Sequence, residues 1–292
     1  MKLMVTGGSG FIGRHIVERL GDRYQILAPS HRELELTDSD AVAAWLKRHP
    51  VDAVIHAAVR PGHRNAADPT QQVETNLRMY LNLTRCRDLW GRMVYISSGA
   101  VYGAQQDIVA ATEELAGAIV PADEHGLSRL VIADLVRQED RVVELRPFGV
   151  FGAYEDYAIR FISNAICKTL FDLPVTLRQD RRFSYLYVED LMPVLAHFVE
   201  HEAAEKSYNV VPDSTVCLRD VAELVVAVSG KDLPVQVAHG GIGMEYTGDN
   251  ARLRSTIPGL RFTPLGVAVE RLYRWYAEHR RDIVYERLLV DK

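Results

Sequence analysis

Cysteine is scarce in this 292-residue sequence, which contains only Cys86, Cys167 and Cys217. Because these three are far apart, odd in number and without metal-ligand spacing, they exclude a disulfide framework, and we expect no metal site. Unpaired thiols of this kind are typical of a reducing compartment. We therefore expect three reduced, buried cysteines in a cytoplasmic protein.

Long apolar runs are also lacking. None approaches the roughly 20 residues that a membrane helix needs, and Met1 leads straight into an apolar segment, which leaves no room for a signal peptide. Neither sign of charge dominates, since 34 Lys and Arg stand against 39 Asp and Glu, for a net charge of −5. We therefore expect neither a membrane nor a nucleic-acid polymer as a partner.

Glycine, by contrast, is concentrated near the start of the chain. The apolar run Lys2-Leu3-Met4-Val5 precedes Gly7 and then Gly8-Ser9-Gly10-Phe11-Ile12-Gly13, which has the spacing G-x-G-x-x-G, and a helical pattern follows directly. Glycines in this context let the backbone approach a pyrophosphate, and the N-terminus of the next helix supplies amide donors. The sequence therefore predicts a dinucleotide-binding loop.

Short aliphatic runs alternate with helical patterns through the first half of the chain. We predict strands at residues 2–6, 24–28, 53–56, 93–97 and 142–146. We predict helices at residues 15–20, 39–49, about 70–90 and 126–138. This alternation indicates an α/β fold with a doubly wound parallel sheet of the Rossmann type.

The pattern becomes less regular after residue 150, where we predict a smaller C-terminal substrate-binding lobe. The predicted dinucleotide-binding domain is 1–150 with 184–210 returning to it, and the predicted lobe is 151–292, mainly 151–183 and 211–292. Within the second half we expect a helix up to residue 171, a strand at 183–188, a flexible glycine loop at 240–243 and a helix at 264–281.

Several further segments match one known family. They are His56-Ala57-Ala58, Asn76, Ser97-Ser98, Val101-Tyr102-Gly103, Arg146-Pro147-Phe148, Tyr187-Val188-Glu189-Asp190-Leu191 and Tyr208-Asn209-Val210. With the glycine loop, they resemble the extended short-chain dehydrogenase/reductase (NAD-dependent epimerase/dehydratase) family over nearly the whole chain. The resemblance implies a cytoplasmic, NAD(P)-dependent oxidoreductase or epimerase that acts on a nucleotide-sugar.

The resemblance also implies the catalytic residues, with one departure. Ser98 stands where the family's serine contacts the substrate carbonyl, although a serine there could simply cap a turn. The family's Tyr-x-x-x-Lys is replaced by His125 and Arg129. Histidine exchanges protons near neutrality, so His125 is the expected proton donor, with Tyr102 or a water as the alternative, while Arg129 can hold ribose hydroxyls but cannot relay a proton. A cofactor-binding regulatory or scaffold protein without turnover is the rival interpretation.

Neighbouring positions narrow the reaction that the resemblance implies. Dehydratases of the family carry an Asp-Glu pair after the serine, and the GDP-fucose synthases carry a cysteine, whereas this chain has Gly99 and Ala100. Neither side chain can remove a carbon-bound proton. A nucleotide-sugar 4-keto reductase is therefore expected, and a 4-epimerase is the alternative.

The cofactor is expected to be NADP, with NAD as the alternative. Arg32 follows the second predicted strand, where a guanidinium favours the 2′-phosphate of NADP, although Glu33 beside it is a competing carboxylate. The resemblance places the adenine near Glu35 and Leu36. The full set expected to bind the cofactor is Gly7, Gly8, Gly10, Phe11, Ile12, Gly13, Arg32, Glu35, Leu36, Ala57, Ala58 and Asn76.

Substrate contacts are expected from both halves of the chain. Arg182, or its neighbour Arg181, is expected to pair with diphosphate oxygens, and Gly149 takes the place of an amide residue of the family. Tyr157 belongs to a polar aromatic loop that could close over a sugar or only anchor the lobe. The set expected to bind substrate is Tyr102, Gly149, Tyr157, Arg160, Arg182 and Arg252. By analogy with the family, the helices at about 70–90 and 126–138 form a homodimer.

Overall fold

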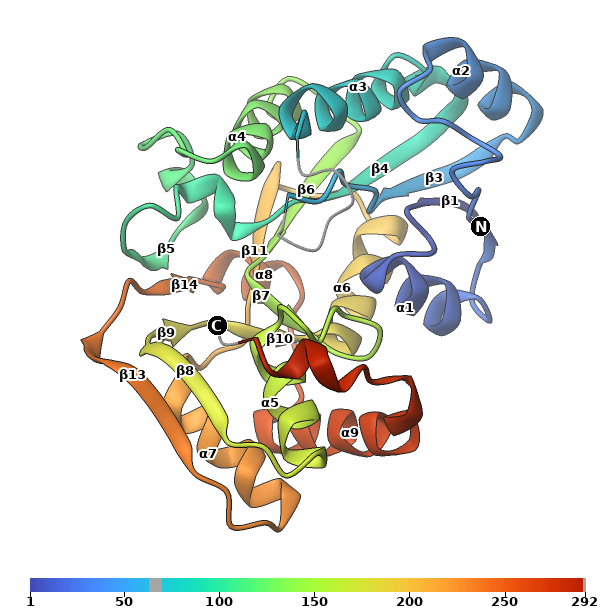
Figure 1. Cartoon of the computed structure of the whole chain (residues 1–292). Coiled ribbons are helices and arrows are strands. Elements are labelled where there is room, and N and C mark those ends of the chain that lie inside the picture. The colour runs from blue at the N-terminus through green and yellow to red at the C-terminus, as the bar shows by residue number, and fades with distance from the viewer. Residues whose placement is uncertain (63–69, 291–292) are drawn as a thin grey trace.

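The computed structural model, drawn in Figure 1, describes residues 1–62 and 70–290. Its centre is a six-stranded sheet in the order β11-β6-β4-β3-β1-β2, with all neighbouring strands parallel. The strands are β1 (Lys2–Thr6), β2 (Gln25–Leu27), β3 (Val51–His56), β4 (Trp90–Ile96), β6 (Val142–Pro147) and β11 (Ser207–Val210). The strand order reverses at β1, so a crevice opens beyond the carboxyl ends of β1 and β3. The predicted doubly wound parallel sheet is confirmed.

Helices cover both faces of this sheet (Figure 1). One face is covered by α1 (Phe11–Leu20) and α6 (Val188–Glu200), and the other by α2 (Ser39–Arg48), α3 (Gln72–Thr84) and α4 (Glu124–Val136). In β1, Leu3 and Val5 pack in the cluster with α1 and α6, whereas Met4 packs with the other three helices. Because successive side chains of a strand point to opposite faces, a strand buried on both sides has a continuous apolar run.

A smaller lobe lies beside the sheet, in the lower part of Figure 1. Its helices are α5 (Phe161–Leu170), α7 (Leu218–Ser229) and α9 (Leu265–Glu278), which share one apolar core. The parallel pair β8 (Val175–Asp180) and β13 (Val235–Ile242) packs against α7. A second parallel pair is formed by β7 (Gly149–Phe151) and β10 (Tyr185–Tyr187).

A four-stranded sheet connects the lobe to the segment after β4. Its order is β12-β9-β14-β5, with β5 (Ile108–Ala111), β9 (Arg182–Phe183), β12 (Val216–Cys217) and β14 (Tyr246–Gly248). The remaining helices are α8 (Ala251–Thr256) and the short 3₁₀ segments η1 (Arg87–Leu89), η2 (Gly99–Tyr102), η3 (Glu113–Leu115), η4 (Arg280–Asp282) and η5 (Tyr285–Leu288). No helix in the described ranges is long and apolar enough to cross a membrane.

Several expected element boundaries are corrected. The helix expected at about 70–90 ends at Thr84, and Trp90 already begins β4, where its indole donates to the Leu83 carbonyl oxygen at 3.0 Å. The strand expected at 183–188 is divided between β9 and β10, which belong to different sheets, and Val188 begins α6. The glycine loop expected at 240–243 lies largely within β13, where a register shift accommodates it.

Two broader expectations also differ from the structure. All three cysteines are free, but only Cys167 is buried, because Cys86 and Cys217 lie at the ends of short surface elements. Leu253 and Leu260 pack in the sheet core with α1 and α6, so the segment around α8 lies against the sheet, within the range expected to form the lobe. Residues 63–69 and 291–292 of the two predicted domains lie outside the described part.

Candidate active site

The glycine loop after β1 is too closely packed for side chains. Gly7 has φ +70°, and a Cβ added there would lie 2.9 Å from the Ala58 backbone. A Cβ on Gly13 would lie 2.0 Å from the Gly7 carbonyl oxygen, and Gly10 donates its backbone N–H to that oxygen at 2.9 Å. Gly10 precedes α1 and offers no side-chain cap, so the first amides of α1 remain available. These residues fit the pyrophosphate of a dinucleotide.

A cavity of 480 Å³ opens beside this loop. Of the residues expected to bind the cofactor, it is lined by Gly7, Gly8, Glu35, Leu36 and Ala58. Ala57 lies against Gly7, since a Cβ on that glycine would be 3.1 Å from the Ala57 carbonyl carbon. Asn76 supports the wall, because its Oδ1 accepts from the backbone N–H of Arg60 at 2.8 Å. The carboxylate of Glu35 folds back onto its own loop and accepts from the Thr37 hydroxyl at 2.6 Å.

The basic residues that line this cavity are His31 and Arg60, and His31 Nε2 lies 3.1 Å from a Glu35 carboxylate oxygen. Arg32, expected at the 2′-phosphate, is exposed and lies outside the cavity lining. The competing carboxylate Glu33 is also exposed and is bound locally, because it accepts from the Ser30 hydroxyl at 2.7 Å. Sequence reasoning missed Arg60, although its position two residues after Ala58, past the end of β3, was a usable signal.

A second cavity, of 540 Å³, lies between the sheet and the smaller lobe. Phe11 and Ile12 of the glycine loop form part of its lining together with Ser98, His125 and Arg129. The structure therefore brings the three expected catalytic residues to the same cavity, next to the expected dinucleotide loop. The lobe contributes, among others, Gly149, Glu155, Arg160, Arg181, Phe183, Tyr185 and Tyr246.

Ser98 is positioned by the end of β4. Its Oγ accepts from the Ala100 backbone N–H at 3.2 Å, which caps η2, and lies 3.4 Å from the Tyr246 hydroxyl. The simple capping interpretation is therefore satisfied, but it uses only an acceptor site of the oxygen. The Ser98 hydroxyl proton remains able to donate to a polar atom in the cavity.

His125 and Arg129 lie one turn apart on the same side of α4. Asp123 caps this helix by accepting from the Gly126 backbone N–H at 2.8 Å, and a Cβ on Gly126 would lie 2.7 Å from the Ala100 carbonyl oxygen. This close approach holds the start of α4 against the turn that follows Ser98. Residues spaced by four share a helix face, so both side chains reach the cavity.

Arg129 is a buried cation, only 4% exposed. Its Nη1 donates to the Tyr95 hydroxyl, and its guanidinium lies 5.5 Å from the centre of that ring. Nε has no hydrogen-bond partner within the described residues, and no carboxylate there pairs with the guanidinium. Arg129 therefore brings a positive charge without a paired carboxylate to the lining of the cavity.

This buried charge affects the histidines nearby. Burial, reinforced by Arg129, lowers the pKa of His125 to about 4 and that of His56 to about 3. His125 is consequently a neutral imidazole at pH 7, without the extra proton that an imidazolium donor requires. The expectation that His125 is already poised to exchange protons near neutrality does not agree with this environment.

Gly149 lines the second cavity for a steric reason. A Cβ there would lie 2.9 Å from Cδ1 of Tyr185 and 3.1 Å from the Ser184 carbonyl oxygen. The Tyr185 ring thus occupies the space into which the family's amide side chain would project, and burial raises the pKa of its hydroxyl. Tyr185 could have been noticed in the sequence only from its pairing with β7, which is not a local signal.

Two arginines besides Arg129 face the second cavity, Arg160 at the start of α5 and Arg181 after β8. Arg181 is held by donation from Nε to the Met244 carbonyl oxygen at 2.7 Å. Arg182 points elsewhere, toward Thr215 at 3.3 Å and Glu245 at 3.9 Å. The two consecutive arginines therefore point in different directions. The structure favours Arg181, the alternative named from the sequence.

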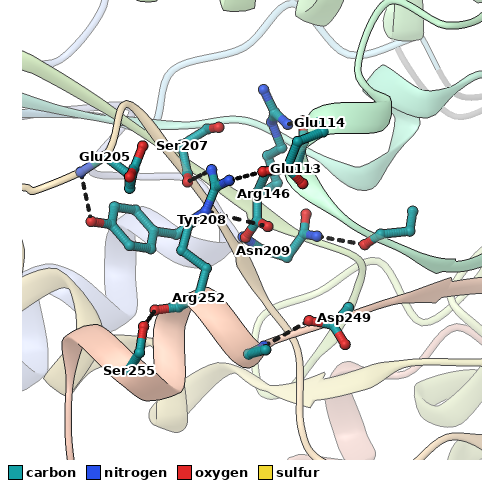
Figure 2. A network of polar contacts seen from close by, with 12 residues as sticks. Glu113, Glu114, Arg146, Glu205, Ser207, Tyr208, Asn209, Asp249, Arg252 and Ser255 are labelled. Atoms are coloured by element: carbon teal, nitrogen blue, oxygen red, sulfur yellow. Dashed lines mark hydrogen bonds and ion pairs between the residues drawn. The ribbon is translucent and has the colours of Figure 1, made fainter.

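Three other expected substrate residues lie outside the lining of this cavity. Arg252 belongs to a polar network at the sheet edge (Figure 2), where it donates to the Ser207 carbonyl oxygen at 3.1 Å and pairs with Glu114. Tyr102 is buried and donates to Asn209 at 2.7 Å. The Tyr157 hydroxyl accepts from the Val284 backbone N–H at 2.8 Å, as expected of a residue that anchors the lobe.

Tyr246 is another cavity residue that sequence reasoning missed. It lies in the three-residue strand β14, between Ile108 of β5 and Phe183 of β9. All of these pairings are distant in sequence, so no local pattern could have placed Tyr246 beside Ser98. Its ring packs 4.8 Å from that of Phe148 and 5.5 Å from that of Phe183.

Known proteins of similar sequence and structure include enzymes that act on nucleotide-sugars. A GDP-6-deoxy-D-mannose reductase from Pseudomonas aeruginosa is 27% identical over 252 residues, covering 80% of this chain and 82% of that protein. The dTDP-glucose 4,6-dehydratase 1 of Escherichia coli is 28% identical over 260 residues, covering 72% of each. A Campylobacter jejuni GDP-mannoheptose C4 reductase, solved with NADP bound, superimposes with a TM-score of 0.81 at 16% identity, covering 94% of this chain and 98% of that one; this likeness shows the fold alone.

The family assignment rests on a longer match. The model of the NAD dependent epimerase/dehydratase family matches residues 3–211, which include the glycine loop, Ser98 and the start of α4. Members of this family are enzymes that use a nicotinamide cofactor, so the expectation of an enzyme is confirmed. This chain belongs to the NAD dependent epimerase/dehydratase family.

Proposed function

We propose that the protein is an NADP-dependent reductase of a 4-keto nucleotide-sugar. The observation that carries the proposal is that Ser98, Phe11 and Ile12 line one cavity. A carbonyl group bound to the Ser98 hydroxyl would thus lie in the same enclosure as the glycine loop that fits a dinucleotide. The bound cofactor would supply a hydride to the carbonyl carbon.

The chain's own residues supply binding and polarisation. Ser98 donates to the carbonyl oxygen, which stabilises the negative charge that develops there. Arg129 brings its positive charge to the cavity lining, where it attracts negative groups of the cofactor or substrate. Glycines at 7, 8, 10 and 13 and the N-terminus of α1 hold the pyrophosphate. Arg60 supplies positive charge for a 2′-phosphate, and His31 lies beside it in the same lining.

A nucleotide-sugar substrate is supported by the cations of the second cavity and by the relatives. Arg160 and Arg181 lie along its lining, where guanidinium groups can pair with diphosphate oxygens. The similar protein from Pseudomonas aeruginosa is named for a GDP-6-deoxyhexose. Reduction is favoured over dehydration because Gly99 and Ala100, which follow Ser98, carry no acid or base.

We also propose that the protein works in the cytoplasm. This proposal rests on the small number of widely separated, free cysteines.

The test is NADPH oxidation in the presence of GDP-4-keto-6-deoxymannose and, separately, dTDP-4-keto-6-deoxyglucose. We expect one of these ketones to be reduced, and Ser98→Ala to lower kcat/KM about 10²- to 10³-fold because an oxyanion donor is lost. Ser255→Ala is the matched control, since that exposed hydroxyl donates only within α8, to the Arg252 carbonyl oxygen. The affinity for NADPH should remain the same in both variants.

The same assay distinguishes an enzyme from a binding protein. A chain that binds NADPH but oxidises none with either ketone would contradict the proposal. If His125→Tyr combined with Arg129→Lys then produced turnover, the parent would be a protein that kept its cofactor site and lost its reaction. Release and re-capture of the hydride with a 4-hydroxyl sugar, giving its C4 epimer, would instead identify the 4-epimerase.

A further inference from the structure

The proposed reduction needs a proton for the carbonyl oxygen, and the family's tyrosine on α4 is absent. His125 stands in its place, but burial and the nearby Arg129 hold its pKa at about 4. At neutral pH it would have to give up the proton of a neutral imidazole, which is a much weaker acid than a phenol. Another group in the cavity is therefore better suited to supply the proton.

Tyr246 is the phenol that contacts Ser98. Its hydroxyl lies 3.4 Å from Ser98 Oγ, so an oxygen bound to Ser98 would be within reach of both hydroxyl groups. Tyr102, which follows Ser98 closely in the chain, already donates to Asn209 and accepts from Arg146 Nη1 at 3.0 Å. Its proton is engaged, and its side chain lies outside the cavity lining.

The position of Tyr246 is rigidly defined. Its carbonyl oxygen accepts from the Ser184 backbone N–H at 3.1 Å, and the next residue, Thr247, donates to Glu245 and accepts from the Ala110 backbone N–H. The aromatic ring is held between Phe148 and Phe183. A catalytic group held by a sheet and two aromatic neighbours needs little reorganisation before reaction.

We propose that Tyr246, contributed by the smaller lobe, is the catalytic acid that protonates the carbonyl oxygen bound by Ser98. This inference rests on the proposed function. As the carbonyl carbon accepts the hydride, the π electron pair moves to oxygen. The O–H bond of Tyr246 breaks, a new O–H bond forms on the product, and the phenolate regains a proton from water.

The environment of Tyr246 suits an acid. Burial raises the pKa of its phenol to about 12, and the hydrogen bond with Ser98 partly opposes this rise. The group therefore keeps its proton at neutral pH until charge develops on the substrate oxygen. A phenol of this pKa is still acidic enough to protonate an alkoxide.

The experiment compares the intact protein with Tyr246→Phe, which keeps the ring and removes the hydroxyl. We expect kcat with the accepted ketone to fall about 10²- to 10⁴-fold, with NADPH affinity unchanged. Calorimetry with the alcohol GDP-6-deoxymannose should show a loss of affinity of about 2- to 10-fold, the value of one hydrogen bond. This second measurement does not depend on turnover.

Tyr276→Phe is the matched control. Its hydroxyl is buried in the core of the smaller lobe, outside the cavity lining, and has no hydrogen-bond partner among the described residues. We expect it to behave as the parent in all three measurements. His125→Ala should lower kcat less than Tyr246→Phe does.

The outcomes separate this inference from the proposed function. Tyr246→Phe with at least a tenth of the parent kcat, or with unchanged affinity for the alcohol, would overturn the inference and leave the reductase standing. If kcat fell strongly in His125→Ala and not in Tyr246→Phe, the inference would also be overturned and the reductase would stand. A parent protein that reduces neither ketone would refute the proposed function, and the proton-donor role with it.

Discussion

At the scale of the residue, Arg60 and His31 are the side chains that we expect to decide between NADP and NAD. Both line the first cavity, whereas Arg32 lies outside it. We expect the parent to bind NADPH more tightly than NADH, and Arg60→Ala to weaken NADPH about 10- to 100-fold, because a charge-assisted contact is lost, with a smaller effect on NADH.

Calorimetry with the two dinucleotides measures this difference, and Arg32→Ala is the matched variant. If Arg32→Ala removes the preference for NADPH over NADH and Arg60→Ala does not, then Arg32 and not Arg60 binds the 2′-phosphate, as the sequence predicts. Equal affinities of the parent for NADPH and NADH would contradict the choice of NADP altogether.

At the scale of the element, the sequence predicts best what is local. The apolar run of the first strand and the G-x-G-x-x-G spacing of the loop could be recognised directly in the sequence. The helix expected at 15–20 begins earlier, at Phe11, within the glycine motif itself. The boundary at Trp90 could not be found in this way, because its indole closes the turn after α3 while its backbone already belongs to the sheet. The single strand expected at 183–188 is two strands in the structure, because β9 pairs with β12 and β10 pairs with β7.

The residues of the site also divide into those with a local sequence signal and those placed by distant contacts. Ser98 and Gly149 could be assigned from motifs because each belongs to a recognisable segment. Tyr246 and the choice of Arg181 over Arg182 depend on which way a short strand of the lobe faces. Such strands are set by contacts that lie far away in the chain, so their residues have no local signature.

Two elements, α3 and α4, carry the proposal of a homodimer. They pack against each other on the outer side of the sheet, and Leu81 of α3 is 41% exposed there. We expect the parent to sediment as a dimer and Leu81→Asp to shift it toward the monomer, because a buried carboxylate opposes association. Val267→Asp on α9, which is 39% exposed in the parent, is the control and should stay dimeric. A monomeric parent would rule the dimer out.

At the scale of the whole molecule, a buried histidine couples stability to pH. His56 is held neutral, with Thr6 Oγ1 2.7 Å from its Nδ1, and burial lowers its pKa to about 3. Below about pH 6.5 the unfolded chain binds a proton that the folded chain refuses. As the pH falls below 6.5, His56 should therefore lower the free energy of unfolding by up to about 1.4 kcal/mol per pH unit. Above pH 6.5 its contribution to stability is fully present.

Urea unfolding at pH 7.5 and pH 5 measures this dependence. His56→Asn, which keeps a polar side chain but cannot titrate, should lose less stability between the two pH values than the parent does. Identical losses would show that His56 does not contribute to the pH dependence, and that other groups, such as His125 and the carboxylates, account for it.

The approach of Tyr246 to Ser98 joins residues 148 positions apart, one from the sheet and one from the lobe. If the lobe supplies the acid, selection does not have to preserve a tyrosine at position 125, and that position tolerates substitution. A survey that judges activity by Tyr-x-x-x-Lys would then count competent reductases among the inactive relatives. In such chains, the evolutionary record of catalysis would have to be sought in the lobe.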